Sequence, residues 1–198
     1  MVVLGIDIGT TQIKSVLLDV HTKTILGTKT LPNNRMTSSV PSAYIQDPAT
    51  IEASVRFLIS HTARPIDAIT ITGQVHGLLY YDASNEAVSP LYTWLDGRSD
   101  VPLEDGKSPI SRLYEKTGCR LKVGYALATH YAMLLADQIP PEAVGYTGIL
   151  EYITSKLIHT RLDETDESSL AAFGAYTVET HSFDEKVLRE VHPDSRFT

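Results

Sequence analysis

The chain opens on a run of seven residues, VVLGIDI at positions 2–8, that is apolar apart from one glycine and one aspartate. A nearly continuous apolar run of this length is typical of a strand buried on both faces of a sheet. Two further apolar and β-branched runs follow at 13–18 and 25–31, and short polar breaks separate the three. Breaks this short leave no room for a crossover, so we predict an antiparallel meander of three strands.

The next two segments extend this meander into a mixed sheet. Asp47 and Pro48 suit the cap and first turn of a helix, and apolar residues recur at helical spacing over 48–61. Arg64-Pro65 ends that helix, and the apolar run 66–72 reads as a strand. A strand that returns after a helix implies a crossover connection, which predicts a mixed α/β sheet.

The rest of the chain is expected to be mostly helical. Around a turn at 82–85, the apolar stretches predict a hairpin or a pair of short strands. Helices are predicted at 108–118, 126–137, 148–159 and 186–191, the last after a capping box that begins at Ser182. No repeat, low-complexity tract or linker divides the chain, so we expect one domain.

Composition excludes several classes of function. The 198 residues carry 24 acidic and 17 basic side chains, a net charge of −7, which disfavours a partner such as nucleic acid or an anionic membrane. No stretch approaches the roughly 20 apolar residues of a membrane span, and the opening run is too short for a signal peptide. The single cysteine, Cys119, cannot form an internal disulfide and fits a reducing compartment. We therefore expect a soluble cytoplasmic protein.

The first candidate site follows the opening strand. Asp7 offers the oxygen ligands that Mg²⁺ prefers, and Gly9 allows a backbone to approach a phosphate. Thr10 and Thr11 add hydroxyl donors, and Lys14 lies three residues further on. The segment matches neither the Walker loop nor the dinucleotide fingerprint. The alternative is a hairpin turn whose glycine and threonines serve only the turn.

The second candidate site is the segment ITGQVHG at 71–77, after the strand predicted to be parallel. Ligands of open α/β sheets bind outside the carboxyl ends of the strands. Gln74 and His76 could bind sugar hydroxyls, and on an extended segment two residues apart they would point to the same side. The alternative is a loop with a surface histidine.

The third candidate site is the segment TWLDGR at 93–98. Trp94, the only tryptophan, could present its ring to a polyol while Asp96 or Arg98 engages a hydroxyl. Tyr125 is a weaker candidate for the same pocket. The alternative is a core tryptophan beside a surface Asp–Arg pair. The sequence lacks zinc-type His/Cys spacings and the GxSxG motif, so nothing supports metalloprotease or serine-hydrolase chemistry.

In this order, the three motifs resemble the N-terminal domain of the FGGY carbohydrate kinases. The segment GIDIGTT at 5–11 looks like the opening phosphate loop of that family. The segment TGQVHG at 72–77 is similar to the GQMHG element of its xylulokinase and sedoheptulokinase members, and WLDGR at 94–98 resembles its W-x-D-x-R element. The resemblance runs from about residue 2 to residue 191.

The resemblance implies a ribonuclease-H-like α/β fold, shared with actin, Hsp70 and hexokinase, and phosphorylation of a ketose or polyol by ATP with Mg²⁺. It gives Asp7 the role of binding magnesium. It assigns the ATP phosphates to Gly9, Thr10, Thr11 and Lys14, and the sugar to Gln74, His76, Trp94, Asp96, Arg98 and Tyr125. The sugar itself cannot be named, because epimers differ by single hydroxyls. A homodimer is compatible with the family.

The chain departs from the family in one respect. Residues 1–198 correspond to the sugar-binding N-terminal domain, whereas the catalytic aspartate of the family lies in a Gly-Asp element of a second, ATP-binding domain. We therefore expect no catalytic base here, and no sugar phosphorylation by this chain alone. Two other interpretations stay open: a non-catalytic sugar-binding or regulatory protein built on the same domain, and an ATPase module of the actin and Hsp70 type.

Overall fold

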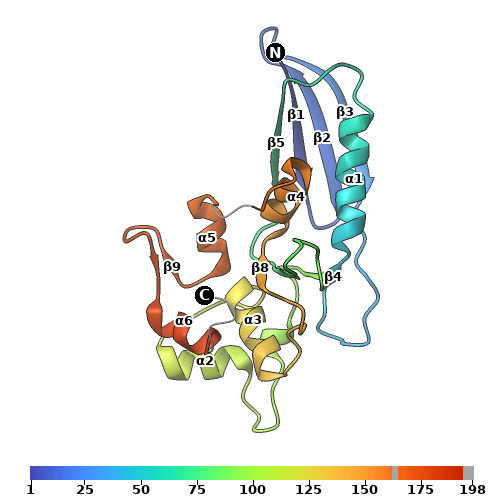
Figure 1. Ribbon diagram of the computed structural model, residues 1–198. Helices are drawn as coiled ribbons and strands as arrows, with labels where there is room; N and C mark the ends of the chain where they lie inside the picture. The colour runs from blue at the N-terminus through green and yellow to red at the C-terminus, as the bar shows by residue number, and fades with distance from the viewer. Residues whose placement is uncertain (162–164, 194–198) are drawn as a thin grey trace.

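A mixed four-stranded sheet forms one end of the molecule (Figure 1). The computed structural model describes residues 1–161 and 165–193. Strands β1 (Val2–Ile8), β2 (Gln12–Asp19) and β3 (Thr24–Pro32) form the predicted antiparallel meander, and β5 (Ala68–Gly73) pairs parallel with β1. The strand order β3-β2-β1-β5 confirms the crossover read from the sequence.

Helix α1 (Pro48–Ser60) makes that crossover. The side chain of Asp47 caps it by accepting hydrogen bonds from the backbone N–H groups of Ala49 and Thr50, and Pro48 occupies the first turn. Both features are as the sequence predicted, because the cap and the proline act locally.

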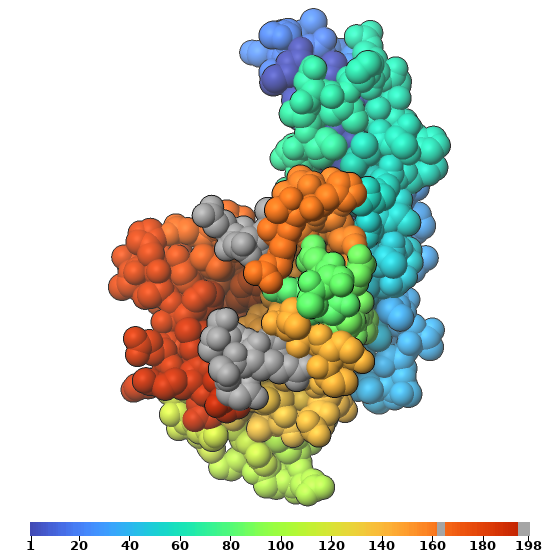
Figure 2. Space-filling model, in the orientation of Figure 1, coloured from blue at the N-terminus to red at the C-terminus, as the bar shows by residue number. Residues whose placement is uncertain are grey.

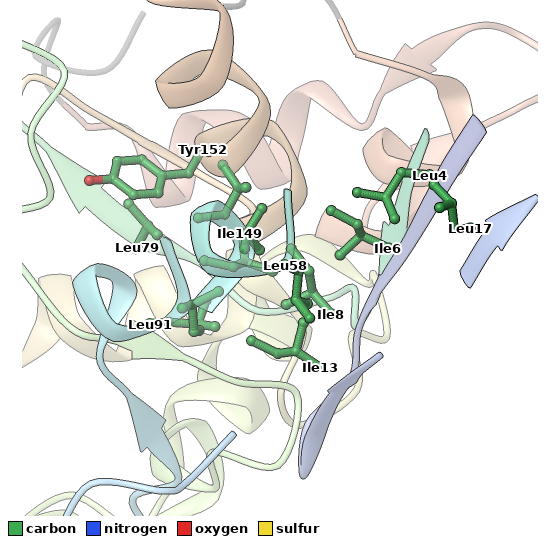
Figure 3. Packing of buried hydrophobic residues seen from close by; sticks show 13 residues of the cluster. Leu4, Ile6, Ile8, Ile13, Leu17, Leu58, Leu79, Leu91, Ile149 and Tyr152 are labelled. Atoms are coloured by element: carbon green, nitrogen blue, oxygen red, sulfur yellow. The ribbon is translucent and has the colours of Figure 1, made fainter. Parts of the chain in front are cut away.

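One face of the sheet carries the main core (Figure 3). Leu4, Ile6 and Ile8 of β1 pack with Leu58 of α1 and with Ile149 of α4 (Ile149–Ile158). Figure 2 shows α4, in orange, between the cyan residues of α1 and the red C-terminal part of the chain. The helix predicted at 148–159 is therefore present, and its apolar side completes this core.

The opposite face of the sheet differs from the prediction. The apolar opening run indicated a strand buried on both faces, but Asp7 is exposed, and so are Lys14 on β2 and Thr72 on β5. The expectation that β1 is buried on both faces, which would turn Asp7 inward, is therefore wrong. Side chains alternate along a strand, and the helices described here cover only the face to which Leu4, Ile6 and Ile8 point.

Short strands connect the sheet to the other end of the molecule. The strands β6 (Leu79–Tyr81) and β7 (Leu91–Tyr92) confirm the predicted pair on either side of a turn. They do not pair with each other as a ladder: isolated bridges join Leu78 to Tyr92 and Tyr81 to Ala87. Instead, β6 pairs with β8 (Gly145–Thr147) and β7 pairs with β4 (Ile45–Gln46). Local sequence could not reveal these partners, because they lie far away along the chain.

The other end of the molecule is mainly helical. A short 3-10 helix lies at Arg98–Asp100, and the longer elements are α2 (Pro109–Thr117), α3 (Ala126–Leu135), α5 (Glu167–Phe173) and α6 (Glu185–Val191), with the hairpin strands β9 (Tyr176–Thr177) and β10 (Ser182–Phe183) between the last two helices. Helix α5 was not predicted from the sequence. Helices α2, α3 and α6 share a second apolar cluster that includes Leu113, Tyr131 and Val187.

The capping box predicted at Ser182 is wrong by two residues. The side chain of Asp184 caps α6, accepting hydrogen bonds from the N–H groups of Lys186 and Val187. Ser182 lies in β10, paired with Thr177, so its backbone belongs to a strand. Within residues 1–161 and 165–193, no helix is long and apolar enough to cross a membrane.

Candidate functional site

Hydrogen bonds to its carbonyl groups fix the loop between β1 and β2. Each of the four carbonyls at positions 8–11 accepts a hydrogen bond from outside the loop. The donors, in chain order of the acceptors, are Gln74 N (2.9 Å), Asn33 Nδ2 (2.8 Å), Gln46 Nε2 (2.8 Å) and Asn33 N (2.9 Å). These bonds fix the main chain of the predicted phosphate loop.

The N–H groups of this loop are arranged differently. The N–H of Gly9 donates to the carbonyl of Gln12 at 3.0 Å. The N–H groups of Thr10 and Thr11 donate no hydrogen bond to any of the described residues. Thr11 is exposed and Thr10 half-buried. Successive backbone N–H groups left for an outside acceptor are the usual elements of an anion site in a loop.

Asp7 and Lys14 lie on the open face of the sheet beside this loop. They occupy opposite positions in the register of β1 and β2, and Thr72 of β5 lies across from Asp7 on the other side. All three line a shallow hollow of about 330 Å³. The hollow is lined by the carboxylate of Asp7, by the two lysines Lys14 and Lys29, and by threonine hydroxyls. No group of three or more metal-ligating side chains is found in residues 1–161 and 165–193.

Trp94 and Gln74 converge on the same loop from two other segments. The indole Nε1 of Trp94 donates to the hydroxyl of Thr10 at 2.9 Å, and that hydroxyl donates to Oε1 of Gln74 at 3.3 Å. Trp94 is 45% exposed, so its ring stays available to a ligand. The structure thus joins the three predicted motifs through one threonine hydroxyl, although the sequence separates Thr10 from Trp94 by 84 positions.

His76 and Tyr125 form a second part of the site. Their rings stack with centroids 4.6 Å apart and planes 2° from parallel, and His76 Nδ1 lies 2.9 Å from the carbonyl oxygen of Ala172. The extended backbone predicted for this segment is wrong, because His76 has a φ of +74°. The next residue, Gly77, packs so closely on the Tyr92 carbonyl that a Cβ would lie 2.5 Å from its oxygen, so this position requires glycine.

Asp96 and Arg98 stabilise the turn that carries Trp94, in which the N–H of Asp96 donates to the carbonyl of Thr93. Asp96 is fully buried, and its carboxylate accepts hydrogen bonds from Tyr44 N at 3.1 Å and from Arg98 Nε at 2.7 Å and Nη2 at 3.0 Å. The guanidinium of Arg98 also lies 4.1 Å from the centroid of the Tyr92 ring. The alternative of a core tryptophan beside a surface pair is wrong on both counts. Direct contact of Asp96 or Arg98 with sugar stays a prediction.

Two residues of the site were missed in the sequence. Gln46 and Asn33 are both buried, and between them they supply three of the four donors to the loop carbonyls. The only local signal was a pair of amide side chains near the ends of predicted elements. That signal is weak, because amide residues are common in loops.

Comparisons with known proteins agree with this fold. The profile of the N-terminal domain of the FGGY family of carbohydrate kinases matches residues 2–196. The gluconokinase of Bacillus subtilis (strain 168) is 28% identical over 195 residues, which are 94% of this chain and 37% of that protein. The xylulose kinase of Streptomyces coelicolor is 27% identical over 202 residues, or 97% of this chain and 40% of that one.

Solved structures show the same architecture. The ligand-bound xylulose kinase from Lactobacillus acidophilus superposes with a TM-score of 0.79 at 22% identity, covering 99% of this chain and 41% of that one. This similarity establishes the actin- and hexokinase-like fold. The chain spans about two fifths of the length of the relatives it matches.

Proposed function

The chain belongs to the FGGY family of carbohydrate kinases, and on that premise we propose that it forms the sugar-binding side, and one phosphate-binding loop, of a kinase that transfers the terminal phosphoryl group of ATP to a ketose or polyol. The observation that carries the proposal is the hydroxyl of Thr10, which bonds to Trp94 and to Gln74 at once. The groups suited to a sugar and the loop suited to a phosphate therefore meet at one residue.

In this proposal the sugar lies against the exposed ring of Trp94. The amide of Gln74 and the stacked pair His76 and Tyr125 supply its polar contacts. A sugar has apolar C–H faces and a rim of hydroxyls, so it matches one flat ring bordered by donors and acceptors. Asp96 and Arg98 act beneath, holding the turn that carries Trp94.

The phosphates of ATP are assigned to the N–H groups and hydroxyls of Thr10 and Thr11, with Lys14 adding positive charge. Asp7 is the residue suited to hold Mg²⁺, since magnesium in kinases is bound by one or two carboxylates together with the phosphates. When bound, the ion would neutralise charge on the phosphates. A lone exposed carboxylate at the end of β1, facing Lys14 and Thr72, fits that donor set.

Phosphoryl transfer also needs a group that orients the attacking hydroxyl. The 198 residues contain no Gly-Asp element like the one that carries the catalytic aspartate of the family. We therefore expect this chain to bind sugar without turning it over. The complete reaction is proposed for a longer protein in the cytoplasm, of which this domain is a part.

The experiment is a binding titration that uses Trp94, the only tryptophan, as its fluorophore. D-Xylulose and D-gluconate are added to the native chain and to Gln74→Ala. Gln138→Ala is the control, because Gln138 is an exposed glutamine that belongs to none of the three motifs. Loss of one partner of a sugar hydroxyl should weaken binding by roughly 5- to 150-fold in Gln74→Ala alone. Equal affinities in all three proteins, or no binding at all, would contradict the proposal.

A second variant separates the two halves of the site. Asp7→Ala is expected to leave sugar affinity unchanged while it abolishes the Mg²⁺ dependence of polyphosphate binding, because Asp7 lies on the open face of the sheet. An equal loss of sugar binding would place Asp7 in the sugar pocket instead. Sugar binding with no binding of magnesium polyphosphate by the native chain would favour the non-catalytic sugar-binding protein.

A further inference from the structure

We propose that Gln46 is a positioning residue that couples the sugar pocket to the phosphate loop, so that sugar binding prepares the loop for phosphate. The inference rests on the proposed function above and assigns a role to a residue outside the three motifs. It starts from the fully buried amide of Gln46, which connects Gln74 to the backbone of Thr10.

All the hydrogen-bonding groups of this amide have partners. Nε2 of Gln46 donates to the carbonyl oxygens of Thr10 at 2.8 Å and of Asn33 at 3.2 Å. Oε1 of Gln46 accepts from Nε2 of Gln74 at 2.8 Å. The opposite orientation of the amide would set its oxygen against two carbonyl oxygens, so these partners determine which way it points. Burial makes each of these bonds costly to lose.

Gln74, Gln46 and Thr10 thereby form a closed ring of contacts. Gln74 binds Gln46 through its nitrogen and the hydroxyl of Thr10 through its oxygen, while Gln46 holds the carbonyl of Thr10. The same hydroxyl also accepts from Trp94. In this state the Thr10 side chain is occupied by the groups assigned to the sugar.

Sugar binding would change this arrangement in a defined way. A sugar hydroxyl that donates to Oε1 of Gln74 replaces the bond from the hydroxyl of Thr10, which then becomes a free donor for phosphate. The carbonyl of Thr10 stays bound to Gln46, so the N–H of Thr11, which belongs to the same planar peptide group, keeps its direction. Gln46 therefore keeps the backbone of the loop in place, so that release of the Thr10 hydroxyl completes an anion site.

The test measures the coupling between two ligands. The affinity of the native chain for D-xylulose and D-gluconate is measured from Trp94 fluorescence, with and without magnesium tripolyphosphate. Coupling between two sites is typically 5- to 150-fold in affinity, so we expect tripolyphosphate to tighten sugar binding at least about 5-fold. Gln46→Met keeps a similar side-chain volume but has no amide hydrogen-bonding groups. In this variant the ratio of sugar affinities with and without magnesium tripolyphosphate, the coupling factor, should fall to about one, while each ligand alone binds within about tenfold of native. Gln138→Met is the matched control and should keep the native factor.

The possible results separate this inference from the proposed function. If the native chain binds neither sugar, the proposed function fails, and the role of Gln46 fails with it. If the native chain binds sugar and tripolyphosphate but Gln46→Met keeps the native coupling factor, or the native factor is one, only the positioning role is refuted.

A second variant gives an answer if Gln46→Met does not fold, as circular dichroism would show. In Gln46→Glu, an ionised carboxylate would face two carbonyl oxygens and could donate to neither, so coupling should be absent at pH 7. The protonated form has one O–H donor, and burial raises the pKa of a carboxyl group above its ordinary value. The coupling factor should therefore increase as the pH falls toward 5. A factor independent of pH would contradict the proposal, since a residue that only fills space has no such dependence.

Discussion

Substitution of Gly124 by alanine is the sharpest test of how the site is supported. Gly124 has a φ of +83°, and an added Cβ would lie 1.9 Å from the carbonyl oxygen of Trp94. It also precedes Tyr125, whose ring stacks on His76. One methyl group at this position is therefore directed at the backbone of Trp94 and lies next to the second aromatic pair of the site.

The expected loss of stability in Gly124→Ala follows from a comparison with Gly118, which ends helix α2. Gly118 has nearly the same φ, +77°, but a Cβ there meets nothing within 4 Å. Alanine at either position costs about 1–2 kcal/mol for the left-handed backbone. At Gly124 the Trp94 carbonyl must also move by about 1.1 Å before the contact reaches the 3.0 Å minimum. Overpacking of this kind adds roughly 1–3 kcal/mol.

The assay is urea unfolding of both variants, followed by circular dichroism, with the emission of Trp94 recorded in the folded state. We expect Gly124→Ala to be less stable than Gly118→Ala by about 1–3 kcal/mol, and to be the only one with altered Trp94 emission and weakened sugar binding. Equal stabilities, together with native emission from both variants, would refute the reasoning, because they would mean that Gly124 does not support Trp94.

Two further predictions concern a helix cap and the cysteine. Asp47→Ala should lower the free energy of unfolding in urea by about 1 kcal/mol, because α1 loses a cap that accepts from the N–H groups of Ala49 and Thr50. Asp47→Asn should lower it less, and an unfolding midpoint of native value in Asp47→Ala would contradict the prediction. Burial, with a smaller contribution from the Asp184 carboxylate, raises the pKa of the Cys119 thiol, so it should react at pH 8 more slowly with a disulfide reagent than the unfolded chain does. Because the folded chain holds this proton more tightly, the thiol contributes to stability below its ordinary pKa, and this contribution is lost as the pH rises through the pKa of the folded state. A folded chain that reacts with the reagent as fast as the unfolded chain would contradict the prediction.

Local sequence patterns were sufficient for the four-stranded sheet, for helix α1 and for the position of the three motifs along the chain, but not for helix α5. The meander, the crossover helix and the parallel return follow from runs of apolar residues and from a cap at Asp47, which act within a few residues. The loop at 9–11, the turn at Gln74 and the segment at Trp94 all follow predicted strands, and each lies at the end of one. These features depend on residues that are neighbours in the chain, so they can be predicted from the sequence alone.

The burial of polar groups was decided only by the tertiary structure. Periodicity shows that residues 4, 6 and 8 share one face of β1, but it does not show which face is covered, and Asp7 proved to be exposed. Asp96 was predicted to engage a sugar hydroxyl or, as the alternative, to form a surface pair with Arg98; it is fully buried, because its partners include Tyr44, 52 positions away. Gln46 was not predicted as a site residue, although it forms hydrogen bonds with Gln74 and Thr10, which lie 28 and 36 positions away. A buried carboxylate or amide is stable only when remote segments supply its hydrogen bonds, and it is the folded arrangement that brings those segments together.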